Sequence, residues 1–148
     1  TLHYLNTMQP DRFKSVITVG GLIYHSKQLR EWIAKTGLNQ LMEWAKYHGP
    51  EKQEYLARVV WESRKLYGDA SFTPDILNTI KANWLVVLGD NDVAIPIQLG
   101  IEMHQNIPNS RLWIVPNGEH LPHLNPDIQP EFLRVSLEFL NGKWDKKD

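Results

Sequence analysis

Residues 84 to 96 read Trp84-Leu85-Val86-Val87-Leu88-Gly89-Asp90-Asn91-Asp92-Val93-Ala94-Ile95-Pro96. The run opens with uninterrupted apolar residues, as in strands that are covered on both faces, and it ends in glycine and acidic residues. Such strands are typical of parallel sheets with helices packed on either side. This run therefore predicts an α/β fold.

Strands and helices alternate on both sides of this run. Ser15 to Val19 is a β-branched run that ends at the Gly20-Gly21 pair, and Arg111 to Val115 is a third strand candidate. Helical spacing covers residues 1–9, 75–82 and 96–106, and a closing helix is expected from Pro130 to Gly142. The inner face of that closing helix is expected to carry Phe132, Leu133, Leu137 and Leu140. Because helices separate the strands, the crossovers predict three parallel strands with flanking helices.

A long helical segment interrupts this alternation. Residues 22–73 show helical spacing with many aromatic residues, and Gly37 and the Gly49-Pro50 pair are expected to divide them into three helices. We predict a helical cap insertion at 22–73 on a core formed by residues 1–21 and 74–148. At 148 residues, the chain 1–148 is long enough for one such domain and too short for two.

Composition excludes several classes of protein. The net charge of −1, with acidic and basic residues interleaved, offers no surface for nucleic acid or an anionic membrane. No apolar run approaches the roughly 20 residues that span a bilayer. The chain contains no cysteine, which excludes disulfides and thiolate metal sites and fits a reducing, cytoplasmic location.

Reactive side chains gather in the loops that follow the second and third strands. The carboxyl ends of parallel strands meet at one edge of a sheet, so carboxylates of 90–96 and imidazoles of 116–123 could come together there. An aspartate that accepts a bond from histidine Nδ1–H leaves Nε2 to act as a general base. Asp92 and His120 are the candidates, although Asp92 is equally suited to cap a turn.

Other polar residues of these loops have simpler interpretations. Asp90 is expected to cap its turn, and His3, His25, His48 and His104 to be solvated or packed. His123 is expected to line a pocket or to bond to the backbone. A metal site made of Asp92, His120 and His123 is the least favoured alternative.

The run 84–96, the helix up to Ser110, the strand 111–115 and Gly118-Glu119-His120 together resemble the α/β-hydrolase fold. In that pattern Asp92 stands at the position of the catalytic acid, because it is the second carboxylate of a Gly-Asp-x-Asp motif that is followed by x-x-x-Pro. His120 stands at the position of the catalytic histidine. Residues 1–21 are similar to the helix after the nucleophile and the next strand. The resemblance implies a partial α/β-hydrolase fold with a cap, and an esterase-like, serine-type enzyme that needs no cofactor or metal.

The sequence departs from the family at the nucleophile. The family carries it in Gly-x-Ser-x-Gly at a strand-to-helix turn, and none of the chain's serines has these flanking glycines. Thr1 begins in helical sequence without a cap. We therefore expect a C-terminal portion without a nucleophile, inactive alone.

Two functions follow. In the first, a complete enzyme uses Asp92 and His120 on a small apolar substrate, with esters, lactones, diketones and haloalkanes all left open. In the second, the chain is a non-catalytic module that self-associates through the open edge of strand 15–19. The expected partner is accordingly a second copy of the chain or the N-terminal half of the hydrolase.

Overall fold

The structure is a computed structural model that describes residues 13–45, 49, 52–55, 58–59 and 72–144. The helix expected over residues 1–9 and most of the third helix expected within residues 22–73 lie outside these ranges. The chain divides into two compact units, one formed by Thr1–Ile23 with Phe72–Asp148 and the other by Tyr24–Ser71.

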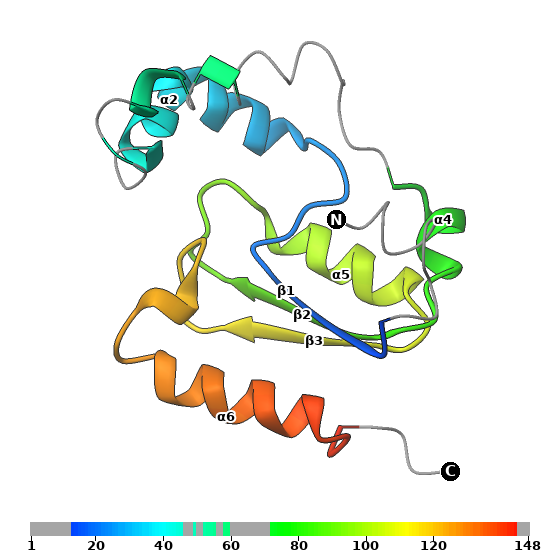
Figure 1. Ribbon diagram of the computed structural model, residues 1–148. Coiled ribbons are helices and arrows are strands. Elements are labelled where there is room, and N and C mark those ends of the chain that lie inside the picture. Colours follow the sequence, from blue (N-terminus) through cyan, green and yellow to red (C-terminus); the bar gives the residue numbers. More distant parts are fainter. Residues whose placement is uncertain (1–12, 46–48, 50–51, 56–57, 60–71, 145–148) are drawn as a thin grey trace. The chain divides into compact units, whose positions relative to one another are not determined.

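The first unit is built on a parallel sheet (Figure 1). Its strands are β1 (Ser15–Val19), β2 (Asn83–Gly89) and β3 (Ser110–Val115), and they lie in the order β1-β2-β3. Val16 pairs with Trp84, and Val86 pairs with Leu112. The predicted α/β class and the three predicted parallel strands are confirmed.

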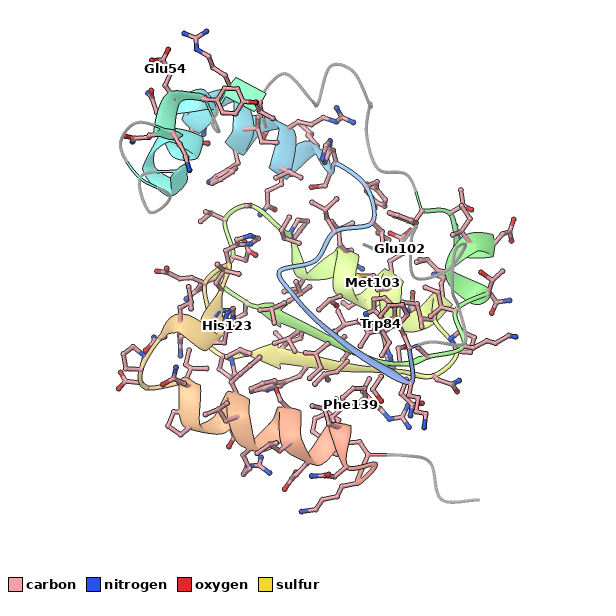
Figure 2. All side chains as sticks on the ribbon, viewed as in Figure 1. Glu54, Trp84, Glu102, Met103, His123 and Phe139 are labelled. Atoms are coloured by element: carbon pink, nitrogen blue, oxygen red, sulfur yellow. The ribbon has the colours of Figure 1, made fainter. Side chains whose placement is uncertain are left out.

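Strand β2 is buried because helices cover both faces of the sheet. Helix α5 (Ile97–Asn106) lies on one side and α6 (Gln129–Leu140) on the other (Figure 1). Side chains alternate along a strand, so Trp84 and Leu85 point to opposite faces. Figure 2 shows Trp84 and Met103 of α5 on one face and Phe139 of α6 on the other. The core facing α6 contains Leu85, Val87, Val115, Val135 and Phe139.

Short helices complete this unit. Helix α4 (Pro74–Asn78) begins at Thr73, whose hydroxyl accepts the Ile76 N–H at 3.5 Å. It ends earlier than the helix expected over 75–82. A single 3-10 turn, η3 (Pro122–Leu124), links β3 to α6.

The predicted inner face of α6 was wrong for three of its four residues. Leu133, Leu137 and Leu140 are 54%, 58% and 54% exposed. The helix buries Val135, Ser136 and Phe139, while Phe132 packs against the core. Two apolar stripes run along this helix at helical spacing, and the sequence pattern does not say which one meets the sheet.

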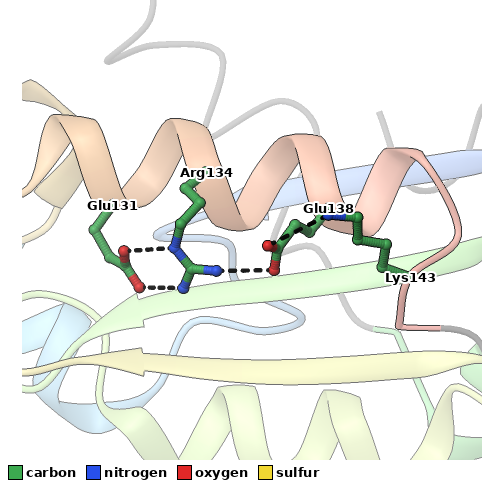
Figure 3. Close-up of polar contacts among 4 residues, drawn as sticks. All are labelled: Glu131, Arg134, Glu138 and Lys143. Carbon is green, nitrogen blue, oxygen red and sulfur yellow. Dashed lines mark hydrogen bonds and ion pairs between the residues drawn. The ribbon is translucent and has the colours of Figure 1, made fainter.

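The exposed side of α6 also carries a line of ion pairs (Figure 3). The guanidinium of Arg134 contacts Glu131 at 2.6 Å and Glu138 at 2.9 Å. Lys143 lies 3.7 Å from the other carboxylate oxygen of Glu138. The Glu131 and Glu138 carboxylates raise the pKa of Arg134. The charges keep this side of the helix in solvent while its other side packs on the sheet.

The second unit contains the long helix α2 (Lys27–Ala45). The Ser26 hydroxyl accepts the Leu29 N–H at 3.2 Å, which caps its first turn. The break expected at Gly37 was wrong, because α2 continues through this residue. A glycine inside a helix costs only about 1 kcal/mol relative to alanine, too little to end a helix that its neighbours support. The predicted role of residues 22–73 as a cap stays a prediction.

In the described part of the chain, no helix has the length and apolar character that crossing a bilayer demands.

Candidate active site

Asp92 lies in the loop that follows β2, and its carboxylate is held by the loop itself. Oδ1 accepts the backbone N–H groups of Ala94 at 2.8 Å and Ile95 at 2.9 Å. The side chain is fully buried, with 0% of its surface exposed. These bonds fix the direction of the carboxylate, so Oδ2 has one orientation available.

His120 lies in the loop after β3, and its ring faces Oδ2 of Asp92. Nδ1 of His120 is 2.8 Å from Oδ2 of Asp92. An ionised carboxylate only accepts hydrogen bonds, so Nδ1 carries the proton and donates it. In the neutral ring Nε2 is then unprotonated. The imidazole is 49% exposed, which leaves it accessible to a reacting group.

Backbone contacts lock the two loops together. The Asp90 N–H donates to the Val115 carbonyl at 3.2 Å, and the Asn91 N–H donates to the Gly118 carbonyl at 2.9 Å. Gly89 and Gly118 pack so closely that a Cβ on Gly89 would overlap the Gly118 carbonyl. This close approach brings the loop that carries Asp92 within reach of the loop that carries His120.

Each member of the pair shifts the pKa of the other in the direction that favours its ionised form. Burial alone would raise the pKa of Asp92, but the bonds from His120, Ile95 and Ala94 outweigh it, and the pKa falls below its ordinary value. The hydrogen bond to Asp92 raises the pKa of His120, burial opposes the rise, and the charge of Asp92 adds to it. The carboxylate therefore stabilises an imidazolium at this position.

The structure brings together the two residues that the sequence singled out. Asp92 is a turn cap through Oδ1 and a partner of His120 through Oδ2, so it makes the contacts that both interpretations of this residue require. Asp90 is exposed in the turn. His3 and His48 lie outside the described residues. His104 lies on α5 and places its Nδ1 3.0 Å from the Ser110 hydroxyl at the start of β3, the strand whose other end leads to His120.

His123 packs against helix α6. Its ring packs against Phe132, with 5.2 Å between the ring centroids. Nδ1 is buried and has no hydrogen-bond partner, so the expected backbone bond is not found at this atom. Within the described ranges, no three histidine or acidic side chains are grouped as a metal site requires. The alternative of a metal bound by Asp92, His120 and His123 is therefore not supported.

A hollow of about 430 Å³ lies beside His120. Its walls combine apolar and polar side chains from residues 117–125. The lining residues are Asn117, Glu119, His120, Leu121, Pro122, Leu124 and Asn125. Apart from His120, none of these residues was predicted from the sequence to belong to a site. Their proximity to His120 in the chain was the only available signal.

Comparison with known proteins identifies the fold. No protein-family model matches the sequence, and no curated protein does. The structure is similar to a serine hydrolase from the bacterium Cycloclasticus zankles, with a TM-score of 0.64 and 20% identity over 98% of this chain and 61% of that one. It is similar to a serine hydrolase involved in carbazole degradation, with a TM-score of 0.69 and 17% identity over 95% of this chain and 58% of that one. The structure is also similar to an esterase from Rhodococcus sp. ECU1013, with a TM-score of 0.62 and 14% sequence identity over 93% of this chain and 60% of the esterase chain.

A further similar structure, from a deep-sea metagenome library, is an alpha/beta hydrolase enzyme. The parallel sheet and flanking helices of the first unit therefore have a partial α/β-hydrolase fold, as predicted. The chain covers about 60% of the length of the similar chains. At these low identities the similarity establishes the fold alone.

Proposed function

We propose that this chain supplies the acid and the general base of a serine-type, esterase-like hydrolase. The observation that carries the proposal is the 2.8 Å bond between His120 Nδ1 and Asp92 Oδ2, made by a carboxylate whose other oxygen is already fixed by two backbone N–H groups. Asp92 orients the ring and stabilises its charged form. His120 is the catalytic base.

In the proposed reaction Nε2 of His120 takes the proton from a serine hydroxyl as the hydroxyl attacks the substrate carbonyl. It returns the proton to the leaving group, and it then activates water in the same way to release the acyl group. A positioned base of this kind contributes about 10²- to 10⁴-fold in rate. The mechanism requires no metal or cofactor.

The nucleophile and the oxyanion hole would come from polypeptide outside these 148 residues, since no Gly-x-Ser-x-Gly occurs among them. The chain's coverage of about 60% of the similar hydrolases is consistent with such a contribution. By itself the chain is expected to be inactive.

A small apolar ester, or a related acyl or carbon–carbon substrate, is the proposed substrate class. The hollow beside His120 supports this choice because Leu121, Pro122 and Leu124 line it. One of the similar proteins is an esterase. Residues 22–73 are proposed to be the cap of the complete enzyme.

The test reconstitutes the enzyme. The coding sequence adjoining these residues is searched for a strand, a Gly-x-Ser-x-Gly turn and a helix, and that segment is produced with the chain. Hydrolysis of p-nitrophenyl butyrate is measured for each part and for both together. We expect activity only from the combination, and a loss of at least about 100-fold with His120→Ala.

His104→Ala is the matched control, because His104 bonds to Ser110 at the start of β3 rather than to Asp92. It should leave the rate of hydrolysis within a few-fold of the parent. Activity that survives His120→Ala would show that the assignment is wrong.

A second candidate function is a non-catalytic, self-associating module. Strand β1 is the outermost strand at one edge of the described sheet, and none of its residues is fully buried. An open strand edge of this kind can pair with another chain. Sedimentation of the 148-residue chain at micromolar concentration tests this candidate: a dimer supports it, and a stable monomer counts against it.

A further inference from the structure

Gly20 is the first residue after β1, and the sheet holds its backbone in place. Its N–H donates to the Val87 carbonyl of β2 at 3.0 Å. Its φ angle is +59°, in the left-handed region that glycine enters without a steric penalty. The chain therefore leaves β1 in one defined direction, fixed by its neighbour strand.

The space beside Gly20 is filled by His120. A Cβ at Gly20 would lie 2.6 Å from the His120 carbonyl oxygen, 2.8 Å from Cε1 and 2.9 Å from Nδ1. All three of these nearest atoms belong to the one residue, and two of them form the edge of the ring that bonds to Asp92. Real Cβ atoms essentially never lie within 3.0 Å of such neighbours, so an added methyl group must displace the ring or its backbone.

We propose that Gly20 is a positioning residue for His120. The ring is held by two features: the Asp92 carboxylate is bonded to Nδ1, and the Nδ1–Cε1 edge occupies the space that a Cβ on residue 20 would fill. Because the imidazole is 49% exposed, it has room to swing outward once this edge is pushed. That movement would lengthen the Nδ1 to Oδ2 bond and abolish the oriented base.

The decisive experiment records the imidazole signals of His120 by NMR in the 148-residue chain. In Gly20→Ala we expect the pKa of His120 to fall toward its value in Asp92→Asn, because the bond that raises it is strained or broken. A folded Gly20→Ala protein with an unchanged His120 pKa would overturn the proposal.

Two matched variants separate this effect from ordinary destabilisation. Gly21→Ala places its methyl group next to Thr18, with 3.3 Å to Cβ, and not next to His120. Gly142→Ala introduces the same backbone strain, at a φ angle of +72°, beyond the end of α6. Both should leave the His120 titration unchanged. If either variant shifts it as far as Gly20→Ala does, the specific role of Gly20 is refuted.

The parent chain offers a second measurement that does not depend on a variant folding. A Gly20 Hα should give a strong nuclear Overhauser effect to Hε1 of the His120 ring. Absence of this signal in the folded protein would contradict the proposed contact, and its presence supports it.

The catalytic consequence rests on the proposed hydrolase function. In the reconstituted enzyme, Gly20→Ala should lower kcat by about 10- to 100-fold with little change in KM, since misplacement of a catalytic group by about 1 Å has effects of this size. The NMR results stand even if no hydrolase activity is found, so the two proposals can fail separately.

Discussion

The carboxylate of Asp92 makes two kinds of contact at once: Oδ2 lies 2.8 Å from Nδ1 of His120, and Oδ1 accepts the N–H groups of Ala94 and Ile95. The backbone bonds hold the acid without help from the histidine. Removing the His120 ring should therefore leave Asp92 in place, whereas removing the Asp92 charge should change the pKa of the His120 ring.

Asp92→Asn should lower the pKa of His120. The hydrogen bond to the carboxylate is the largest cause of the raised value, and an amide replaces it with a neutral partner. Titration of the ring protons by NMR measures the change. Asp90→Asn is the control, because Asp90 is an exposed carboxylate in the same turn. Equal His120 pKa values in the parent and in Asp92→Asn would show that the pair does not form in solution.

The stability of the chain should depend on pH through the same pair. The pKa of His120 is raised above its ordinary value of 6.5, so its contribution is complete below pH 6.5 and is lost as pH rises through the folded value. The pKa of Asp92 is lowered below 3.8, so its contribution is complete above pH 3.8 and is lost as pH falls through the folded value.

The pair therefore contributes most between pH 3.8 and pH 6.5. Urea unfolding across this range, for the parent and for His120→Gln, gives the difference in free energy of unfolding. We expect the difference to be largest inside the window and to shrink on both sides. A difference that keeps growing above the window would contradict the direction of the His120 shift.

Much of this arrangement could be predicted from the sequence. The apolar run of β2 fixes a buried parallel strand, and the carboxyl ends of neighbouring strands then bring Asp92 and His120 to one edge. The contribution of Gly20 could not be predicted, since a Gly-Gly pair after a strand indicates only a turn. The contact with His120 is a property of the folded sheet.

The break expected at Gly37 and the buried face of α6 were wrong for a related reason. Local patterns give the preferences of a segment, and tertiary packing then overrides weak preferences. Helix α6 has apolar residues on two faces, and only the position of the sheet selects Val135 and Phe139 over Leu137.

Two neighbouring positions on α6 test this assignment of faces. Phe139 is 3% exposed and belongs to the core cluster, so Phe139→Ala should lower the free energy of unfolding by about 3–5 kcal/mol. Leu140 is 54% exposed, so Leu140→Ala should cost less than about 1 kcal/mol. Chemical denaturation measures both. Comparable losses would mean that another surface covers Leu140 in solution.

A last prediction concerns the bond that joins β1 to β2 through their side chains. The indole Nε1–H of Trp84 donates to the Thr18 hydroxyl at 3.1 Å, and Trp84 is only 1% exposed. Thr18→Val keeps the shape of the side chain but leaves a buried donor without its partner, which should cost about 1–3 kcal/mol. Thr18→Ser keeps the hydroxyl and should cost less, although it gives up a methyl group.

Valine favours strands slightly more than threonine does, so strand propensity alone predicts that Thr18→Val stabilises the protein. Urea unfolding of the two variants decides between these effects, and a Thr18→Val protein as stable as the parent would show that this bond does not hold the edge strand.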